Sequence, residues 1–475
     1  MSDFDIRKLD SFMEEEFARS GFPGVAVTVR NSDGIMYTRG FGYRNIEKGL
    51  PVDGDTIFEI ASLSKSVTAF ALCLLELEGK VSFDEPVSNY FPDYRLPGTP
   101  QQMVTLRHLA MHTSGLPPIQ PLEWSISMNS IERDTQWSRD MRHESPNKMD
   151  KIEDIIEYIS KGDYRVEGYG ILGAPGEYMS YSNEGYAILA AIAEKVSGMP
   201  IDQLLQERIF KPLGMNRTVL DKDAGEARKI AQGNITSLYE REDGQLLCDD
   251  DFSALPPFMG CACIKSTTND LSAYYQMLED RGCYKGKRVF PEAAVERLIG
   301  RAFPLQKKPY YCLGLRKRDI GGLEVVEHYG GLHGASTGGA LIEGGYSVAV
   351  FCNEGNVDVD NFMWGVYNMA AGLPLETKHN WAVPNGEIFR DPDVILGNYV
   401  IAEGTPQYNR IYLEDGQLMA EYYDDKVLLE YCGGSLFAAF SADGKHNFVN
   451  SMEFCVRNNA AWAVRCGERF FIRVK

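Results

Sequence analysis

Ser62 precedes Lys65 by three positions in the segment FEIASLSKSVTAF, residues 58–70. On a helix, residues three apart share one face, so the Lys65 ammonium can reach the Ser62 hydroxyl. A serine hydroxyl is a weak nucleophile at neutral pH, and a desolvated lysine is one group that can take its proton. Free backbone N–H groups at the start of a helix also favour developing negative charge. The pair therefore predicts a nucleophile beside its activator.

A second copy of this spacing, from Ser145 to Lys148, shows how weak the pattern is by itself. It arises by chance roughly once or twice in a chain of this length. The surroundings of Ser145 are polar, whereas Ser62 is followed by apolar residues at helical spacing, namely Val67, Phe70, Ala71, Leu74 and Leu75. From its local context alone, Ser62 is either catalytic or a simple helix cap.

Tyr181 and Asn183 lie on a turn directly before an apolar helical run. A tyrosine phenol can shuttle a proton, and an asparagine amide can accept a hydrogen bond from a lysine and donate one to a substrate carbonyl. The alternative is a helix-capping asparagine beside a core tyrosine. The same pattern occurs at Tyr43 and Asn45 in an expected hairpin, so Tyr-x-Asn alone means little.

His328 stands at the end of an expected strand and is followed by Tyr329, Gly330 and Gly331. Glycines at a strand edge let a substrate backbone approach closely. The Gly331 N–H can then join the Ser62 N–H as an oxyanion hole. Taken singly, a histidine in this position is more often structural.

Together, the three motifs in this order resemble the serine β-lactamase and penicillin-binding protein superfamily. The closer resemblance is to the class C β-lactamase-related esterases and D-aminopeptidases, and it covers about residues 5–372. Three flanking segments agree with it, LRHLAMHTSGLP at 106–117, KSTTNDL at 265–271 and HYGGLHG at 328–334. His112, within the first of these, resembles a structural turn of the family and is left out of the expected catalytic set.

The resemblance implies a role for each motif residue. Ser62 would be the acylated nucleophile and Lys65 its hydrogen-bonded activator. Tyr181 would act as general base in acylation and would activate water in deacylation. Asn183 would orient Lys65 and the substrate amide. The division of proton transfer between Lys65 and Tyr181 stays open at this point.

His328 departs from the Lys-Thr-Gly that β-lactamases and transpeptidases of the superfamily carry at this place. The permanent charge of that lysine helps to bind a substrate carboxylate, while a histidine is only partly protonated near neutral pH. This feature resembles the D-aminopeptidase branch. We therefore expect a serine hydrolase acting on small amides or peptides with D-residues, with an esterase, a weak β-lactamase or a noncatalytic scaffold or sensor as alternatives.

Composition excludes several other classes of function. The net charge of −19 disfavours nucleic acid and anionic membranes as partners. The N-terminal residues lack the features of a signal peptide, and the ten scattered cysteines suit free thiols, so we expect a cytoplasmic protein. The cysteine spacing predicts no metal site, and we expect no cofactor. A small-molecule or peptide substrate is the expected partner, and a homo-oligomer is compatible with the sequence.

The periodicity predicts an α+β fold. A helix at 5–19 and a hairpin at 24–43 precede the Ser62 helix, and a mainly helical block occupies 104–300. Strands return at 322–353 and are followed by a helix at 358–372. Strands on both sides of a helical block imply one antiparallel sheet built from both ends of the segment and flanked by helices, with a helical subdomain.

Three segments are expected along the chain. Residues 1–378 would form the β-lactamase-like domain, with about 119–170 as an insertion near the active site. A proline-containing linker would occupy 379–396. Alternating strands and turns at 397–475 predict a small C-terminal all-β domain, which resembles the lipocalin-like barrel appended to some D-aminopeptidases.

Overall fold

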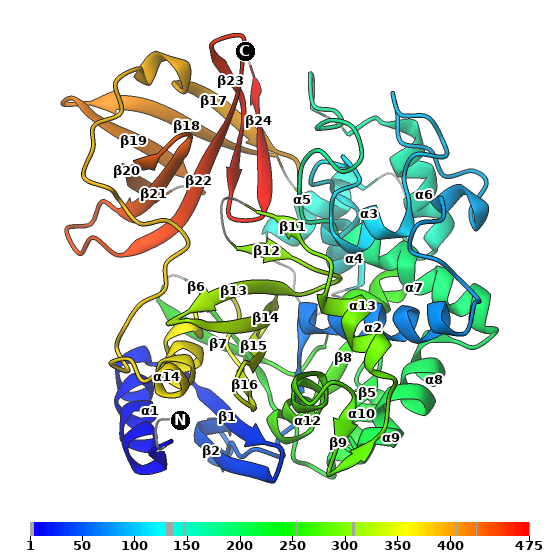
Figure 1. Ribbon diagram of the computed structural model, residues 1–475. Coiled ribbons are helices and arrows are strands. Elements are labelled where there is room, and N and C mark those ends of the chain that lie inside the picture. Colours follow the sequence, from blue (N-terminus) through cyan, green and yellow to red (C-terminus); the bar gives the residue numbers. More distant parts are fainter. Residues whose placement is uncertain are drawn as a thin grey trace.

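A computed structural model describes residues 4–129, 136–145, 149–164, 166–242, 244–252, 254–305, 309–404, 406–423 and 425–474. Figure 1 shows a large α+β unit with a barrel above one end of its sheet. The predicted α+β fold with a separate C-terminal β domain is confirmed.

The main sheet contains nine strands in the described part of the chain, in the order β11-β12-β13-β14-β15-β16-β1-β2-β3. β1 pairs antiparallel with both β16 and β2, so the first strand lies between the last strand and its own hairpin partner. The sheet is thus built from both ends of the segment, as the sequence predicts. Its strands are β1 (Gly24–Asn31), β2 (Gly34–Asn45), β3 (Leu50–Pro51), β11 (Phe303–Pro304), β12 (Tyr310–Tyr311), β13 (Arg316–Ile320), β14 (Leu323–Leu332), β15 (Ala335–Ile342) and β16 (Tyr346–Cys352).

Helices cover both faces of this sheet (Figure 1). On one face α1 (Ile6–Ser20) packs against α14 (Asp360–Ala371), and on the other α12 (Thr268–Glu279) crosses β1, β15 and β16. Asp5 caps the start of α1 by accepting hydrogen bonds from two backbone N–H groups, and Gly21 ends it in the left-handed conformation. These caps fix the helix that covers the N-terminal hairpin.

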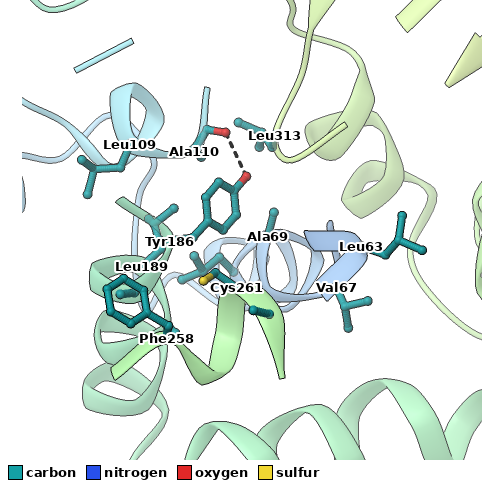
Figure 2. Close-up of a cluster of buried hydrophobic side chains, with 14 of the residues drawn as sticks. Leu63, Val67, Ala69, Leu109, Ala110, Tyr186, Leu189, Phe258, Cys261 and Leu313 are labelled. Atoms are coloured by element: carbon teal, nitrogen blue, oxygen red, sulfur yellow. Dashed lines mark hydrogen bonds between the residues drawn. The ribbon is translucent and has the colours of Figure 1, made fainter. Parts of the chain in front are cut away.

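The helix that follows Ser62 runs through the middle of the helical region. It is α2 (Ser64–Leu77), and a short 3₁₀ turn, η1 (Ala61–Leu63), precedes it. Figure 2 shows its apolar side chains packed against Tyr186 and Leu189 of α7 and against Phe258 and Cys261. The Tyr186 hydroxyl donates to the Ala110 carbonyl at 2.9 Å, so this buried polar group is satisfied. Because α2 is buried, the residues at its start are held rigidly.

The remaining elements complete the helical region and its edges. The helices are α3 (Leu106–Ala110), α4 (Pro121–Asn129), α5 (Gln136–Glu144), α6 (Ile152–Lys161), α7 (Asn183–Ser197), α8 (Ile201–Leu205), α9 (Lys211–Leu213), α10 (Gly225–Ala231), α11 (Met259–Ala262) and α13 (Glu292–Ile299), with short turns η2 (Val87–Asn89), η3 (Gln206–Phe210), η4 (Pro256–Phe258) and η5 (Pro392–Val394). The short strands are β4 (Phe58–Glu59), β5 (Val219–Leu220), β6 (Leu238–Glu242), β7 (Gln245–Asp249), β8 (Ile264–Ser266), β9 (Cys283–Tyr284) and β10 (Lys287–Arg288). No helix among the described residues is long and apolar enough to span a membrane.

The C-terminal domain is a closed antiparallel barrel. Its interior is filled by side chains that include Phe437, Phe454 and Phe471. Other barrel residues, such as Phe470, belong to the same apolar cluster as the helical region, so the two units pack together. The strands are β17 (Gly397–Ile401), β18 (Gln407–Glu414), β19 (Gln417–Tyr422), β20 (Asp425–Gly433), β21 (Leu436–Ser441), β22 (Phe448–Arg457), β23 (Ala460–Cys466) and β24 (Arg469–Val474).

Candidate active site

Ser62 and Lys65 meet as their spacing predicts. Lys65 Nζ donates to Ser62 Oγ at 2.9 Å and to the Cys261 carbonyl at 3.2 Å, and the Lys65 side chain is fully buried. Ala61 precedes the serine with a left-handed φ of 47°. Such a conformation costs a residue with a Cβ on the order of 1 kcal/mol, and strain of this kind concentrates at functional sites. The buried lysine holds the Ser62 hydroxyl at the N-terminal end of α2. The second copy of this spacing provides no comparison here, because Lys148 lies outside the described residues.

Tyr181 lies beside this pair at the turn before α7. Lys65 Nζ is 4.9 Å from the centre of the Tyr181 ring. Ser182, rather than Asn183, caps the helix, because its hydroxyl accepts from the Gly185 N–H at 3.2 Å. Asn183 is the first residue of α7 and is 5% exposed, but Lys65 bonds to Ser62 and Cys261 instead. The structure therefore brings Tyr181 to Lys65, while the expected bond between Asn183 and Lys65 is not made among the described residues.

Gly330 and Gly331 lie on β14 directly against the serine. A Cβ on Gly330 would lie 2.4 Å from the Ile60 carbonyl oxygen and 3.1 Å from the Ser62 nitrogen, so only glycine fits. A Cβ on Gly331 would meet nothing within 4 Å. Thr337 on β15 donates to the Ile60 carbonyl at 3.0 Å and ties the strand pair to the turn before α2.

His328 is more deeply buried than the sequence suggests, with 1% of its surface exposed. Burial, reinforced by the charges of Arg316 and Lys65, holds the pKa of His328 well below its ordinary value. The ring is therefore neutral near pH 7 and provides no charge for a substrate carboxylate. Its Nδ1 lies 2.6 Å from the Tyr329 carbonyl oxygen.

His112, which the sequence analysis left out, belongs to the site. Its ring centre is 4.3 Å from that of Tyr181, and its Nδ1 accepts from the Ser182 N–H at 3.0 Å. Its Nε2 lies 3.1 Å from the hydroxyl of Tyr311, a residue on β12 that no sequence pattern indicated. His112 has a left-handed φ of 57°, which marks it as an unusual position. This backbone conformation could not be predicted from the sequence.

The barrel also reaches the site, through the turn between β23 and β24. The Tyr181 N–H donates to the Glu468 carbonyl at 2.9 Å. The Arg469 guanidinium lies 4.3 Å from the centre of the Tyr181 ring and pairs with Glu403 at 2.6 Å. Figure 1 shows this hairpin, in red, descending from the barrel towards β11 and β12. Sequence reasoning assigned the barrel to a separate unit and missed both residues.

The far wall of the site comes from the sheet edge and from the expected linker. Trp381, within 379–396, stacks against Arg316 and Arg318 at 5.2 and 5.0 Å. Together these elements line an open cavity of about 440 Å³. Its lining includes Ser62, Tyr181, Arg316, His328, Tyr329, Gly330, Gly331, Ser336, Thr337, Asp358, Asp360, Trp381, Glu468 and Arg469. A cavity of this size suits a small ligand, and its charged lining suits a polar one.

This arrangement has the parts of an acyl-transfer site. It holds a serine hydroxyl against a buried amine, with a phenol nearby, and it places the strand residue Gly331 beside Ser62, so that their two backbone N–H groups are candidates for an oxyanion hole. Among the described residues, no group of three or more His, Cys, Asp or Glu side chains is placed to hold a metal ion.

Comparison with known proteins agrees with this geometry. The model of the Beta-lactamase family matches residues 9–368. Penicillin-binding protein 4* of Bacillus subtilis (strain 168) is 29% identical over 278 residues, which are 57% of this chain and 55% of that protein. The chain thus spans about half the length of the curated relatives it matches.

Solved structures extend the likeness to the whole chain. A penicillin-binding protein homologue from Pyrococcus abyssi, described as octameric, is 23% identical with a TM-score of 0.66, over 99% of this chain and 100% of that one. It therefore shares the fold, barrel included. A D-amino acid amidase from Ochrobactrum anthropi SV3, complexed with D-phenylalanine, is 25% identical with a TM-score of 0.59, over 75% of this chain and 93% of that one.

Proposed function

Because the chain belongs to the beta-lactamase family, we propose that it is a serine hydrolase that forms an acyl-enzyme on Ser62. The observation that carries this proposal is the contact between Lys65 Nζ and Ser62 Oγ at 2.9 Å. The lysine is buried while the serine lines a cavity of about 440 Å³. This is the arrangement that nucleophilic catalysis by serine requires.

In the first half of the proposed reaction, Ser62 Oγ attacks the substrate carbonyl carbon. Its proton passes to the pair formed by Lys65 and Tyr181. The Ser62 and Gly331 N–H groups stabilise the oxyanion. Collapse of this intermediate breaks the bond to the leaving amine or alcohol, which takes up the proton, and leaves an ester on Ser62.

In the second half, water replaces the leaving group. Tyr181 takes a proton from the water as it attacks the ester carbonyl, and the proton returns to Ser62 Oγ as the acid leaves. Asn183 would act from the first turn of α7 on the substrate amide, since Lys65 is already held by Ser62 and Cys261.

We assign small amides or peptides with D-residues as the substrate class. The likeness to a D-amino acid amidase supports this choice. The neutral His328 supports it as well, because the site lacks the permanent charge that β-lactamases of the superfamily carry there. We also propose that residues 1–378 form the hydrolase domain and 397–475 the barrel, joined by the linker 379–396, in a cytoplasmic enzyme whose fold is compatible with a homo-oligomer.

The test compares wild-type protein with the Ser62→Ala variant and with Ser145→Ala as the matched control. D- and L-aminoacyl amides, p-nitrophenyl acetate and a chromogenic cephalosporin are the substrates, and a fluorophosphonate is the probe. We expect turnover of D-aminoacyl amides and a mass-spectrometric adduct on Ser62, both absent from Ser62→Ala and retained by Ser145→Ala.

Each other result has a definite meaning. Turnover of the acetate without any amide would replace the proposed substrate class by esters. Efficient cephalosporin hydrolysis would make the protein a β-lactamase. A folded protein that no acylating probe labels at Ser62 would be a noncatalytic member of the family, and the proposal would be wrong.

A further inference from the structure

Three buried side chains form a continuous hydrogen-bonded path across the site. His112 Nε2 lies 3.1 Å from Tyr311 Oη, and the same hydroxyl lies 3.1 Å from His328 Nε2. His112 and His328 are each 1% exposed and Tyr311 is fully buried. With so little exposed surface, each polar atom on this path depends on its neighbours for hydrogen bonds.

Backbone groups at the two ends fix the direction of every bond. At one end the Ser182 N–H donates to His112 Nδ1, so the proton of a neutral His112 ring sits on Nε2 and is donated to Tyr311. At the other end the Tyr329 carbonyl accepts from His328 Nδ1. His328 Nε2 must then accept, and the Tyr311 hydroxyl donates to it.

All these hydrogen bonds can form only when the His112 and His328 rings are both neutral. If His328 were protonated, its Nε2–H would face the Tyr311 oxygen, which already receives the proton of His112 Nε2. The Tyr311 hydroxyl proton would then lack an acceptor in a buried site, at a cost typical of an unmade hydrogen bond. The path therefore selects one protonation state and one tautomer for each ring.

The path also connects two of the three motifs. Its first end is the N–H next to Tyr181, and its other end is the carbonyl next to Gly330. The His112 ring packs on the Tyr181 ring at 4.3 Å. A shift of any member would move either the phenol or the strand edge that faces Ser62.

We propose that Tyr311 is a positioning residue that joins the Tyr181 turn to the Gly330 strand edge and keeps His328 as the neutral Nδ1–H tautomer. This inference rests on the proposed hydrolase function only for its effect on rate. The charged and titratable groups that face His328 are Lys65 from α2, Arg316 from β13, Arg469 from the barrel, His112, Tyr181 and Tyr311. The cations oppose its protonation, and Tyr311 adds the directional bond.

The test compares Tyr311→Phe with Tyr186→Phe. Tyr186 is an equally buried tyrosine whose hydroxyl donates to the Ala110 carbonyl and bonds to neither imidazole. Removal of the Tyr311 hydroxyl frees His328 Nε2 to take a proton. We expect the acid limb of kcat/KM to move to higher pH by about one unit, so that the loss relative to wild type is greatest at the acid end of the profile and smaller near pH 8. Tyr186→Phe should keep the wild-type profile.

Nitrogen NMR of ¹⁵N-histidine protein provides a second readout that needs no substrate. In wild-type protein at pH 7 we expect His112 as the Nε2–H tautomer and His328 as the Nδ1–H tautomer. A protonated His328, the opposite tautomer, or a Tyr311→Phe profile identical to that of Tyr186→Phe would overturn the inference. If Tyr311→Phe does not fold, the wild-type tautomers decide alone. Absence of acylation at Ser62 would refute the proposed function and leave the tautomer result intact.

Discussion

At the residue scale, two cations of the site lie near the Tyr181 ring, whereas its two buried imidazoles are neutral. Lys65 Nζ and the Arg469 guanidinium lie 4.9 and 4.3 Å from the centre of the Tyr181 ring. The imidazoles of His112 and His328 stay neutral and act through hydrogen bonds. Tyr181 therefore contacts both kinds of group, the two cations and the neutral His112 ring.

Tyr181→Phe should lower kcat by roughly 10²- to 10⁴-fold, the usual contribution of general acid–base catalysis. The fold should be kept, because only one hydroxyl is lost and the ring still packs on His112. The matched control is Tyr43→Phe, which carries the same Tyr-x-Asn pattern on an exposed part of β2. Steady-state kinetics of both variants test whether the Tyr181 hydroxyl transfers a proton. A near-normal kcat in Tyr181→Phe would show that Tyr181 has no part in the mechanism.

Glu184, on the first turn of α7, makes stability depend on pH. Burial, together with the Glu403 charge, raises the pKa of Glu184 to about 7. The folded state keeps the proton that the unfolded chain releases above its ordinary pKa near 4.5. The stabilisation from the protonated form is therefore complete below about pH 4.5 and is lost as pH rises to about 7.

Glu184→Gln should remove this loss, because glutamine resembles the protonated acid and cannot ionise. The difference in Tm between the variant and wild-type protein should become more favourable to the variant from pH 5 to pH 8. Thermal unfolding followed by circular dichroism at both pH values measures it. An equal difference at both would mean that Glu184 is already ionised in the folded protein.

At the element scale, the contact between β14 and the turn before α2 sets the distance from the serine to the oxyanion donors. Gly330 allows this contact because no side chain separates the strand from Ile60. Thr337 pins the next strand to the same carbonyl. The strand edge is therefore tied to the turn that carries Ser62.

Gly330→Ala should destabilise the protein by about 1–3 kcal/mol, the usual cost of overpacking, and should reduce activity sharply as β14 moves away from Ser62. Gly331→Ala, one position along the strand, should leave stability nearly unchanged because its Cβ meets nothing within 4 Å. Chemical denaturation of the two variants gives the comparison. Equal stability losses would show that the close approach at Gly330 is not tight.

At the scale of the whole molecule, the barrel completes the cavity. The β23–β24 turn supplies a backbone carbonyl to Tyr181 and a guanidinium to its ring. The Arg469 side chain is 25% exposed and its partner Glu403 19%, so this pair is largely removed from water. The C-terminal domain thus forms part of the wall of the candidate site.

Arg469→Met should lower kcat/KM at least tenfold and also lower Tm, because Glu403 loses its partner in a mostly buried place. The double variant Arg469→Met/Glu403→Gln should recover Tm but not activity. Arg457→Met is the control, since Arg457 bridges the barrel to Glu177 and Tyr178 at 3.2 and 3.0 Å but does not line the cavity. Its half-exposed pair should contribute less than about 1 kcal/mol and leave kcat/KM near wild type. Recovery of activity in the double variant would reduce Arg469 to a structural role.

The sequence by itself determined the elements and the motifs. Apolar periodicity placed the α2 helix, the sheet from both ends of the segment and the C-terminal strands, because each pattern reflects burial within a short stretch of chain. The spacing of Ser62 and Lys65 was enough to predict their contact, since one helical turn fixes it. The order of the three motifs was enough to indicate the family.

Only the tertiary structure decided what surrounds those motifs. His112 and Tyr311 are 199 positions apart, and Tyr181 meets Arg469 across a domain boundary. No local pattern reports such a contact, because strand register and domain packing set it. The neutrality of His328 likewise could not be predicted from the sequence, since its charge depends on burial and on partners from other elements. Local periodicity records which residues are buried, whereas packing decides which buried residues meet.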